Sequence, residues 1–249
     1  MTDRAAAALQ PALKRARSAT GEDVERPHPL GDAEIEYFCR FGAEAIEKPE
    51  TQVQLWDSWG MCQRHALGFL AVESSLNDGW MFRPAVVYDY VIDRARIALA
   101  PRVLFERTRV AASLREAEPC QACALGLDPG VRAQPAAEGI VEEARSLDHL
   151  RAFAAETRPS WEPWICGKCA GSPSSVRCRL HLPDDLETMR HPDLPAHRAL
   201  VDELAARLVA FARSFGWSSR GTETPADRAA LLGAVGWCGG WESILRHLG

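Results

Sequence analysis

Four short pairs of cysteine and histidine constrain this chain more than any other feature of its 249 residues. In chain order the first to fourth pairs are Cys62/His65, Cys120/Cys123, Cys166/Cys169 and Cys178/His181, each with two residues between its members. Two donors at this spacing can reach one tetrahedral ion, because a single tight turn brings their donor atoms together. Together the pairs offer six thiols and two imidazoles, the ligand count of two Cys3His zinc sites. We therefore expect a fold organised around two zinc ions.

The third and fourth pairs form the densest of these signals. A linker of only eight residues separates them, and Gly167, Gly171 and Pro173 suit a tight turn there. Chance is a poor explanation for four candidate ligands so close together. A thiolate-rich set of this kind favours zinc over an iron–sulfur cluster, a redox pair or an incidental arrangement.

The first and second pairs are weaker signals by themselves, since a lone Cys-x-x-His on a helix is usually incidental. Their ligand types complement each other, so we expect them to form the second zinc site. The pairing stays open at this point. The second pair could instead close with the fourth, leaving the third pair to meet the first.

The two remaining cysteines are expected to be core residues. Cys39 is either a substitute ligand or a small buried hydrophobe, and the second interpretation is favoured. Cys238 stands between Trp237 and Gly239 and is interpreted as a core thiol. The tryptophans near the metal motifs, Trp56, Trp59, Trp161 and Trp164, are expected to pack around the sites, with an aromatic-lined pocket as the alternative.

Composition indicates which cellular compartment and which kinds of partner to expect. A hydrophobic content of 47% and a charged content of 25% suit an ordered core. The net charge of -5 and the pI near 5.8 make nucleic acid an unexpected partner. The sequence shows neither an apolar signal-peptide segment nor a run long enough to span a membrane, which favours a cytoplasmic protein without a membrane partner. In that reducing compartment clustered cysteines are usually metal ligands or redox groups. The many Ala, Arg, Gly and Pro residues suggest a bacterial origin.

Helical periodicity runs through most of the chain, and alternating strand patterns are nearly absent. We expect a disordered tail over residues 1–30 and a single helical zinc-binding domain over residues 31–249. The expected helices cover residues 32–48, 62–72, 84–99, 101–117, 137–156 and 195–215, with a last one starting at Thr224-Pro225. Residues 157–183 read as a metal-held loop. The predicted fold is mainly α, a helical bundle-like domain with zinc-held loop segments.

A family resemblance accompanies the motifs. Residues 60–67 (Gly-Met-Cys-Gln-Arg-His-Ala-Leu) and 87–91 (Val-Tyr-Asp-Tyr-Val) resemble an uncharacterised bacterial family with repeated Cys-Pro-x-Cys and Gly-(Phe/Leu)-Cys-x-x-His half-motifs. The likeness covers about residues 35–190, with the second and fourth pairs as the second copy. Glu36 and Cys39 stand where the first copy would carry Cys-x-x-Cys, and the third pair could make good that loss. The resemblance implies helical architecture and metal binding, and no known activity.

Function follows less directly than metal binding. Four protein ligands leave a zinc ion without an open position, which indicates a structural role rather than catalysis. The sequence has no P-loop, dinucleotide fingerprint or hydrolase motif, and no residue can be named as catalytic. The acidic and imidazole-rich stretch from Asp184 to His197 is interpreted as solvated turns and helix caps. We expect an accessory or interaction protein with a protein partner. The alternative is an enzyme of a biosynthetic pathway, with zinc as structural support and a pocket between helices for a small-molecule ligand.

Overall fold

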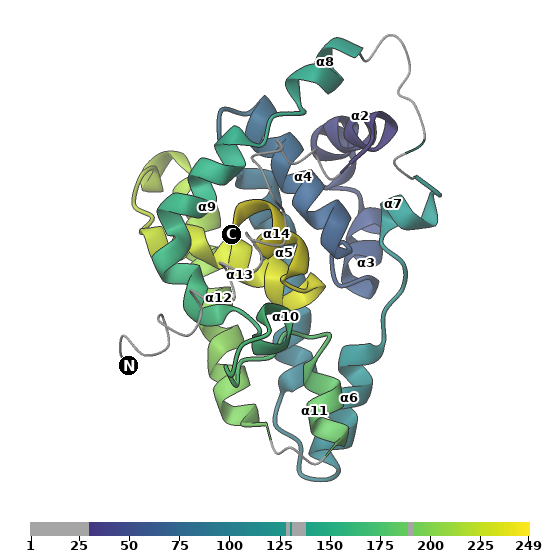
Figure 1. Ribbon diagram of the computed structural model, residues 1–249, viewed down its shortest axis with the longest axis vertical. Coiled ribbons are helices and arrows are strands. Elements are labelled where there is room, and N and C mark those ends of the chain that lie inside the picture. The colour runs from purple at the N-terminus through teal and green to yellow at the C-terminus, as the bar shows by residue number, and fades with distance from the viewer. Residues whose placement is uncertain (1–29, 128–129, 131–137, 189–191) are drawn as a thin grey trace.

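The computed structural model describes residues 30–127, 130, 138–188 and 192–249 of the chain (Figure 1). Within these residues every regular element is a helix, so the predicted mainly α fold is confirmed. The expected disordered tail, residues 1–30, lies outside the described residues except for Leu30. Leu30 is buried, and its side chain packs so closely on Gly68 that a Cβ there would lie 2.3 Å from a Leu30 methyl carbon.

The helices follow one another along the described residues. In chain order they are α2 (Asp32–Arg40), the π-helix η1 (Phe41–Ala45), α3 (Pro49–Asp57), α4 (Gln63–Leu76), α5 (Phe82–Leu99), α6 (Glu106–Arg115), α7 (Gln121–Ala124), α8 (Glu138–Glu143), α9 (Asp148–Trp161), η3 (Glu162–Trp164), α10 (Gly167–Ala170), α11 (Leu182–Glu187), α12 (Leu194–Ser214), η4 (Trp217–Ser219), α13 (Pro225–Gly239) and α14 (Glu242–Leu248).

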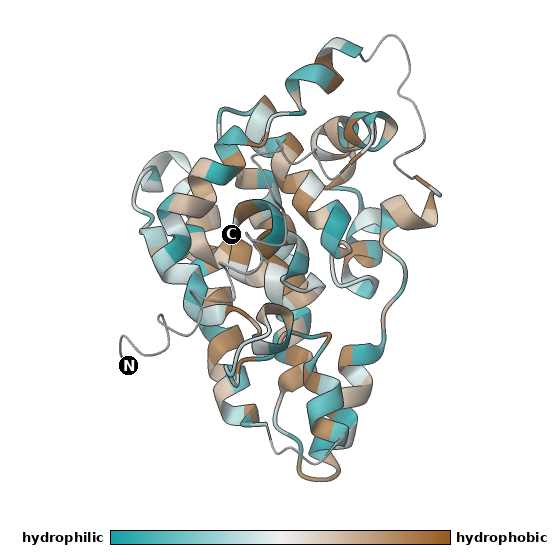
Figure 2. Ribbon diagram, in the orientation of Figure 1, coloured by the Kyte–Doolittle hydropathy of each residue, from teal (hydrophilic) through white to brown (hydrophobic). Residues whose placement is uncertain are grey.

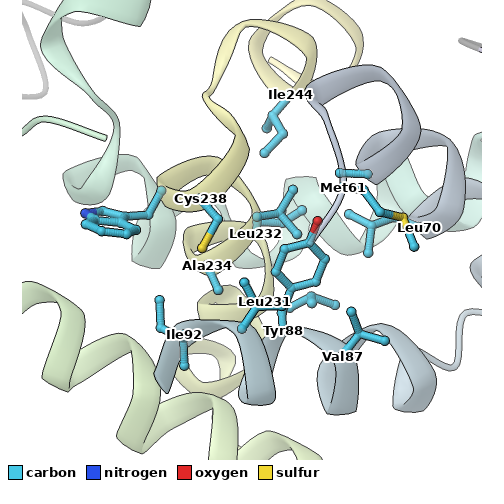
Figure 3. Close-up of a cluster of buried hydrophobic side chains, with 14 of the residues drawn as sticks. Met61, Leu70, Val87, Tyr88, Ile92, Leu231, Leu232, Ala234, Cys238 and Ile244 are labelled. Carbon is cyan, nitrogen blue, oxygen red and sulfur yellow. The ribbon is translucent and has the colours of Figure 1, made fainter. Parts of the chain in front are cut away.

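Helix α13 forms the centre of the core. It packs against α5, α9 and α12, and every residue from Ala229 to Gly239 is buried. A helix that is apolar on all sides needs neighbours on all sides, which explains its central position. Figure 3 shows Leu231, Leu232 and Cys238 of this helix grouped with Tyr88 and Ile92 of α5. Thr224 caps the helix as predicted, since its hydroxyl accepts a hydrogen bond from the backbone N–H of Asp227 and Pro225 follows at the first position.

Three predicted helix boundaries were wrong. The first helix does not run to Pro49, because a π-helix follows Arg40 and Pro49 instead begins α3. Pro101 does not begin a helix either, since residues 101–105 form an exposed loop before α6. The segment predicted as one helix over residues 137–156 contains two helices, α8 and α9, and α9 continues to Trp161. None of the described helices has the length and apolarity needed to cross a membrane.

Candidate metal centres

The four pairs come together as two groups of four donors. Cys62, His65, Cys120 and Cys123 form the first site, and Cys166, Cys169, Cys178 and His181 form the second site. In each group the donor atoms all lie within 4.8 Å of one another, so each group could hold a metal ion. The alternative pairings left open by the sequence are not the ones found. Helices α4 and α7 of the first site lie in the upper half of Figure 1, and α10 and α11 of the second site lie in the lower half.

The same local structure presents the donors in the first three pairs. Cys62, Cys120 and Cys166 each occupy the N-cap of a helix with an extended backbone, and the second donor follows at the third helical position. The backbone N–H of that second residue donates to the sulfur of the leading cysteine, and this hydrogen bond by itself favours a lower pKa of the thiol. A helix N-terminus favours negative charge, so the turn that joins each pair also stabilises its thiolate.

The fourth pair uses a turn instead of a helix start. The backbone N–H of His181 donates to the carbonyl of Cys178 at 3.0 Å, and the N–H of Leu182 donates to the same carbonyl at 2.9 Å. The chain then enters α11, for which His181 is the N-cap. The imidazole therefore sits one tight turn after its partner sulfur.

In the first site the Nδ1 atom of His65 lies close to all three sulfurs. This nitrogen lies 3.3 Å from Cys62 Sγ, 3.2 Å from Cys120 Sγ and 3.4 Å from Cys123 Sγ. The Sγ atoms of Cys62 and Cys123 are 3.9 Å apart. All four donors thus face a common point, with the imidazole at one corner.

A buried carboxylate orients that imidazole. The side chain of Glu34 is fully buried, and its Oε1 accepts a hydrogen bond from His65 Nε2 at 2.7 Å. Arg64 and the backbone N–H of Gly31 donate to the other carboxylate oxygen, both at 2.8 Å. Burial raises the pKa of Glu34, but these hydrogen bonds outweigh it and leave the pKa lowered. The ionised carboxylate fixes the proton of His65 on Nε2 and leaves Nδ1 free to bind a metal.

The sulfurs of the first site share one negative charge when they are close together. A hydrogen bond from the Cys62 thiol, aided by the backbone N–H groups of Cys62 and Cys123, holds the pKa of Cys120 at about 3. The same contact with Cys120, together with burial, raises the pKa of Cys62. Burial and the neighbouring thiolate also raise the pKa of Cys123. A cation placed among the sulfurs would allow all three to ionise, with release of the protons.

The second site has the same composition and similar spacing. His181 Nδ1 lies 3.4 Å from each of the sulfurs of Cys166, Cys169 and Cys178, and the last two sulfurs are 3.8 Å apart. The backbone N–H of Trp241, at the start of α14, donates to the Cys169 sulfur. The second site therefore anchors the C-terminal helix.

Close backbone packing holds the turn of the second site. The N–H of Gly167 donates to the carbonyl of Val176 at 2.9 Å, and a Cβ on Gly167 would lie 2.2 Å from the carbonyl oxygen of Ser174. Only glycine leaves room for this approach. The sequence indicated a tight turn here, and the structure shows which contact requires it.

A salt bridge to the buried Asp185 lies beside the second site. Asp185 of α11 forms an ion pair with Lys168 at 2.8 Å and accepts a hydrogen bond from Arg177 at 2.6 Å. His197 of α12 is buried and accepts from the backbone N–H of Arg177 at 3.2 Å. Asp185 and His197 are therefore buried, so the expectation of a solvated stretch was wrong for them. Asp193 does cap a helix, since its side chain accepts from Ala196 at the start of α12.

An arginine–tryptophan cluster connects the two sites. Arg179 follows the ligand Cys178 directly and stacks on the ring of Trp59, with its guanidinium carbon 5.1 Å from the ring centre. Arg94 stacks on the same ring at 4.1 Å. Trp59 lies just before the first pair, and its indole N–H donates to the carbonyl of Glu116, just before the second pair. One buried ring thus holds segments of both sites.

The two other cysteines lie outside both groups. Cys39 is half-buried beside the core, and burial raises the pKa of its thiol to about 11. Cys238 is fully buried, and burial raises its pKa to about 12. Of the four tryptophans expected in the core, Trp59, Trp161 and Trp164 are buried and Trp56 is partly exposed. The role of Glu34 was not predicted from the sequence. A glutamate three residues after a helix start reads as a simple cap, and its contact with His65 is made across 31 positions of sequence.

The two sites differ in exposure. In the first site Cys62 and Cys123 are exposed, whereas His65 and Cys120 are buried. In the second site Cys166 and Cys178 are buried, and Cys169 is only partly exposed. A reagent from solvent therefore reaches a sulfur of the first site more easily.

No family model, no curated protein and no solved structure matches this chain.

Proposed function

We propose that the protein binds two zinc ions, one in each site, and that both ions are structural. The observation that carries the proposal is the spacing of the donors. Zn–S bonds near 2.3 Å and Zn–N bonds near 2.0–2.1 Å in a tetrahedron put sulfurs roughly 3.8 Å apart and a sulfur and a nitrogen roughly 3.5 Å apart. The two sites have S–S separations of 3.9 and 3.8 Å and S–N separations of 3.2–3.4 Å.

The donor chemistry favours zinc over other metals. Three thiolates and one imidazole form a soft, four-coordinate set of the kind found in structural zinc sites, whereas magnesium and calcium prefer oxygen ligands. An iron–sulfur cluster holds several irons and sulfides and needs more room between its thiolates than a single ion does. We place the protein in the cytoplasm, because thiol ligands need a reducing compartment and all eight cysteines are free.

Elemental analysis tests the number and kind of ions. We expect about two zinc ions per purified chain, because the two sites supply eight donors. A protein without zinc, or one with iron and a visible charge-transfer band, would refute the proposal.

Cobalt substitution tests whether the ions are structural. A filled Cys3His shell should give a tetrahedral, thiolate-rich spectrum that cyanide leaves unchanged, since no position is exchangeable. A shift on adding cyanide would reveal an open position and would favour the enzyme alternative.

The loop between α5 and α6 supports a role in protein–protein interaction. At the tip of this loop Val103, Leu104 and Phe105 are 99%, 64% and 76% exposed. The loop lies at the lower end of the molecule and is coloured mostly brown in Figure 2. Consecutive exposed apolar residues of this kind mark interaction sites more than scattered ones do. Arg102 and Arg109 are exposed beside them, so we propose a partner protein with an apolar recess bordered by acidic residues.

A photo-crosslinking amino acid at Leu104 tests this surface in the cells that make the protein. We expect one defined crosslinked partner that also binds the purified protein and releases it at high salt. The matched control is the same group at Val53, which is 59% exposed on α3. Equal crosslinking from both positions, or none from Leu104, would refute the interaction surface.

The enzyme alternative has one observation in its favour. A cavity of about 420 Å³ lies between η1, the end of α4 and the start of α5, away from both metal sites. Its volume falls within the roughly 300–1,000 Å³ of small-molecule sites.

A further inference from the structure

The cavity beside η1 has an unusual wall. Residues of the π-helix form one side of it, and π-helical segments occur frequently at functional sites. At Gly42 in this segment, a Cβ would lie 1.9 Å from the Oε1 atom of Glu73. The missing side chain at Gly42 is what allows the carboxylate of Glu73 to occupy its position in the wall.

Glu73 supplies a buried charge to the cavity. Its residue is only 3% exposed, and its Oε2 atom accepts from Arg83 and from the side-chain amide of Asn77, both at 3.3 Å. These distances are long for hydrogen bonds to a carboxylate, which normally lie nearer 2.7–2.9 Å. Burial raises the pKa of Glu73, and Arg83 only partly offsets it. The carboxylate is therefore incompletely neutralised by its own neighbours.

The rest of the lining sets the kind of ligand. Two more carboxylates, Glu44 and Glu47, stand at the exposed side of the cavity, and Arg83 is the one basic residue in the lining described. Trp80 and Phe82 contribute aromatic rings that are 45% and 47% exposed. Excess negative charge attracts cations into a recess, and the exposed parts of the aromatic side chains can pack against the apolar body of such a cation.

We propose that this cavity binds a small organic cation, an amine or a guanidinium carried on an apolar body, with the charge against Glu73 and the body against Trp80 and Phe82. The inference does not depend on the proposed zinc, because no lining residue belongs to either metal site.

Three benzene derivatives of similar size and different charge test the proposal on the purified full chain. Benzylamine is a cation, benzyl alcohol is neutral and benzoate is an anion. The readout is the indole N–H resonance of Trp80 in a heteronuclear NMR spectrum, assigned by its loss in Trp80→Phe. We expect benzylamine to shift it saturably at millimolar concentration, and benzyl alcohol to bind at least about fivefold more weakly. A benzoate affinity equal to or above that of benzylamine, or no saturable shift with any probe, would overturn the proposal.

Variants locate the charge that the probe meets. Glu73→Gln should weaken benzylamine binding by about tenfold, because it removes a charge-assisted hydrogen bond. The matched control is Glu223→Gln, which changes a glutamate in a second cavity that Trp80 also lines and should leave the affinity unchanged. If Glu73→Gln does not fold, the double variant Glu44→Gln/Glu47→Gln decides the matter. Both residues are exposed, and the variant should bind benzylamine about two- to fivefold more weakly. Parental affinity in the double variant, or in a folded Glu73→Gln, would refute the site.

Discussion

Replacing Glu34 by glutamine should weaken metal binding at the first site and leave the second site unchanged. The substitution keeps the shape of the side chain and removes the negative charge that His65 and Arg64 face. Partners that orient a metal-bound histidine typically contribute 10–100-fold to affinity, or about 1.4–2.7 kcal/mol. A hydrogen bond to a charged group is worth about 1.5–3 kcal/mol, which leads to the same range independently.

The assay is a competition titration with a chromophoric zinc chelator. The parent protein should release its two ions in two steps, and Glu34→Gln should move one step to a chelator concentration about 10–100-fold lower. Glu36→Gln is the matched control. Glu36 lies on the same helix, is 7% exposed and pairs with Arg40 instead of a ligand. The reasoning is refuted if Glu34→Gln releases both ions as the parent does, or if both variants shift the curve equally.

Three further outcomes follow from the sites. Cys178→Ser should lower the thermal midpoint of unfolding more than Cys238→Ser does. The first variant loses part of a metal-binding free energy of several kcal/mol, whereas the second leaves a buried hydroxyl that costs about 1–3 kcal/mol. The reverse order of midpoints in calorimetry would contradict the assignment of Cys178 as a ligand. Gly167→Ala should lower the free energy of unfolding by about 1–3 kcal/mol or more, because its Cβ would lie 2.2 Å from a backbone oxygen. In the control Gly139→Ala the new Cβ meets nothing within 4 Å, so this variant should be neutral or stabilising when both are unfolded with denaturant. Alkylation with iodoacetamide, followed by peptide mass spectrometry, should modify the exposed Cys123 before any thiol of the second site, and the opposite order would show that exposure does not control the reaction.

Local features of the sequence determined the building blocks of the sites. A donor at Cys120 and another at Cys123 share one turn whatever the rest of the chain does, so their spacing alone indicated joint presentation. The same holds for the helix start at Thr224 and for the all-helical fold, because caps and 3.6-residue periodicity are encoded within a few neighbouring residues. These properties could be predicted because each depends on short-range geometry.

Local patterns failed where packing competes with propensity. Pro49 and Pro101 both suit a helix start, yet one begins α3 and the other lies in an exposed loop. The π-helix after Arg40 has no sequence signature that was recognised, and it places Gly42 against Glu73 of another helix. Such choices depend on contacts between distant segments, which no local window contains.

The tertiary structure alone decided how the pairs combine and what surrounds them. Cys62 and Cys123 meet across 61 positions of sequence, and any of several pairings would have satisfied the same ligand count. The carboxylate of Glu34 on the imidazole of His65, and the stacking of Arg179 on Trp59 between the two sites, likewise come from helices brought together by the core. The sequence by itself determined which atoms can bind a metal, because that is a property of residue type and spacing. Packing determined which of them share an ion, because that requires a position in space.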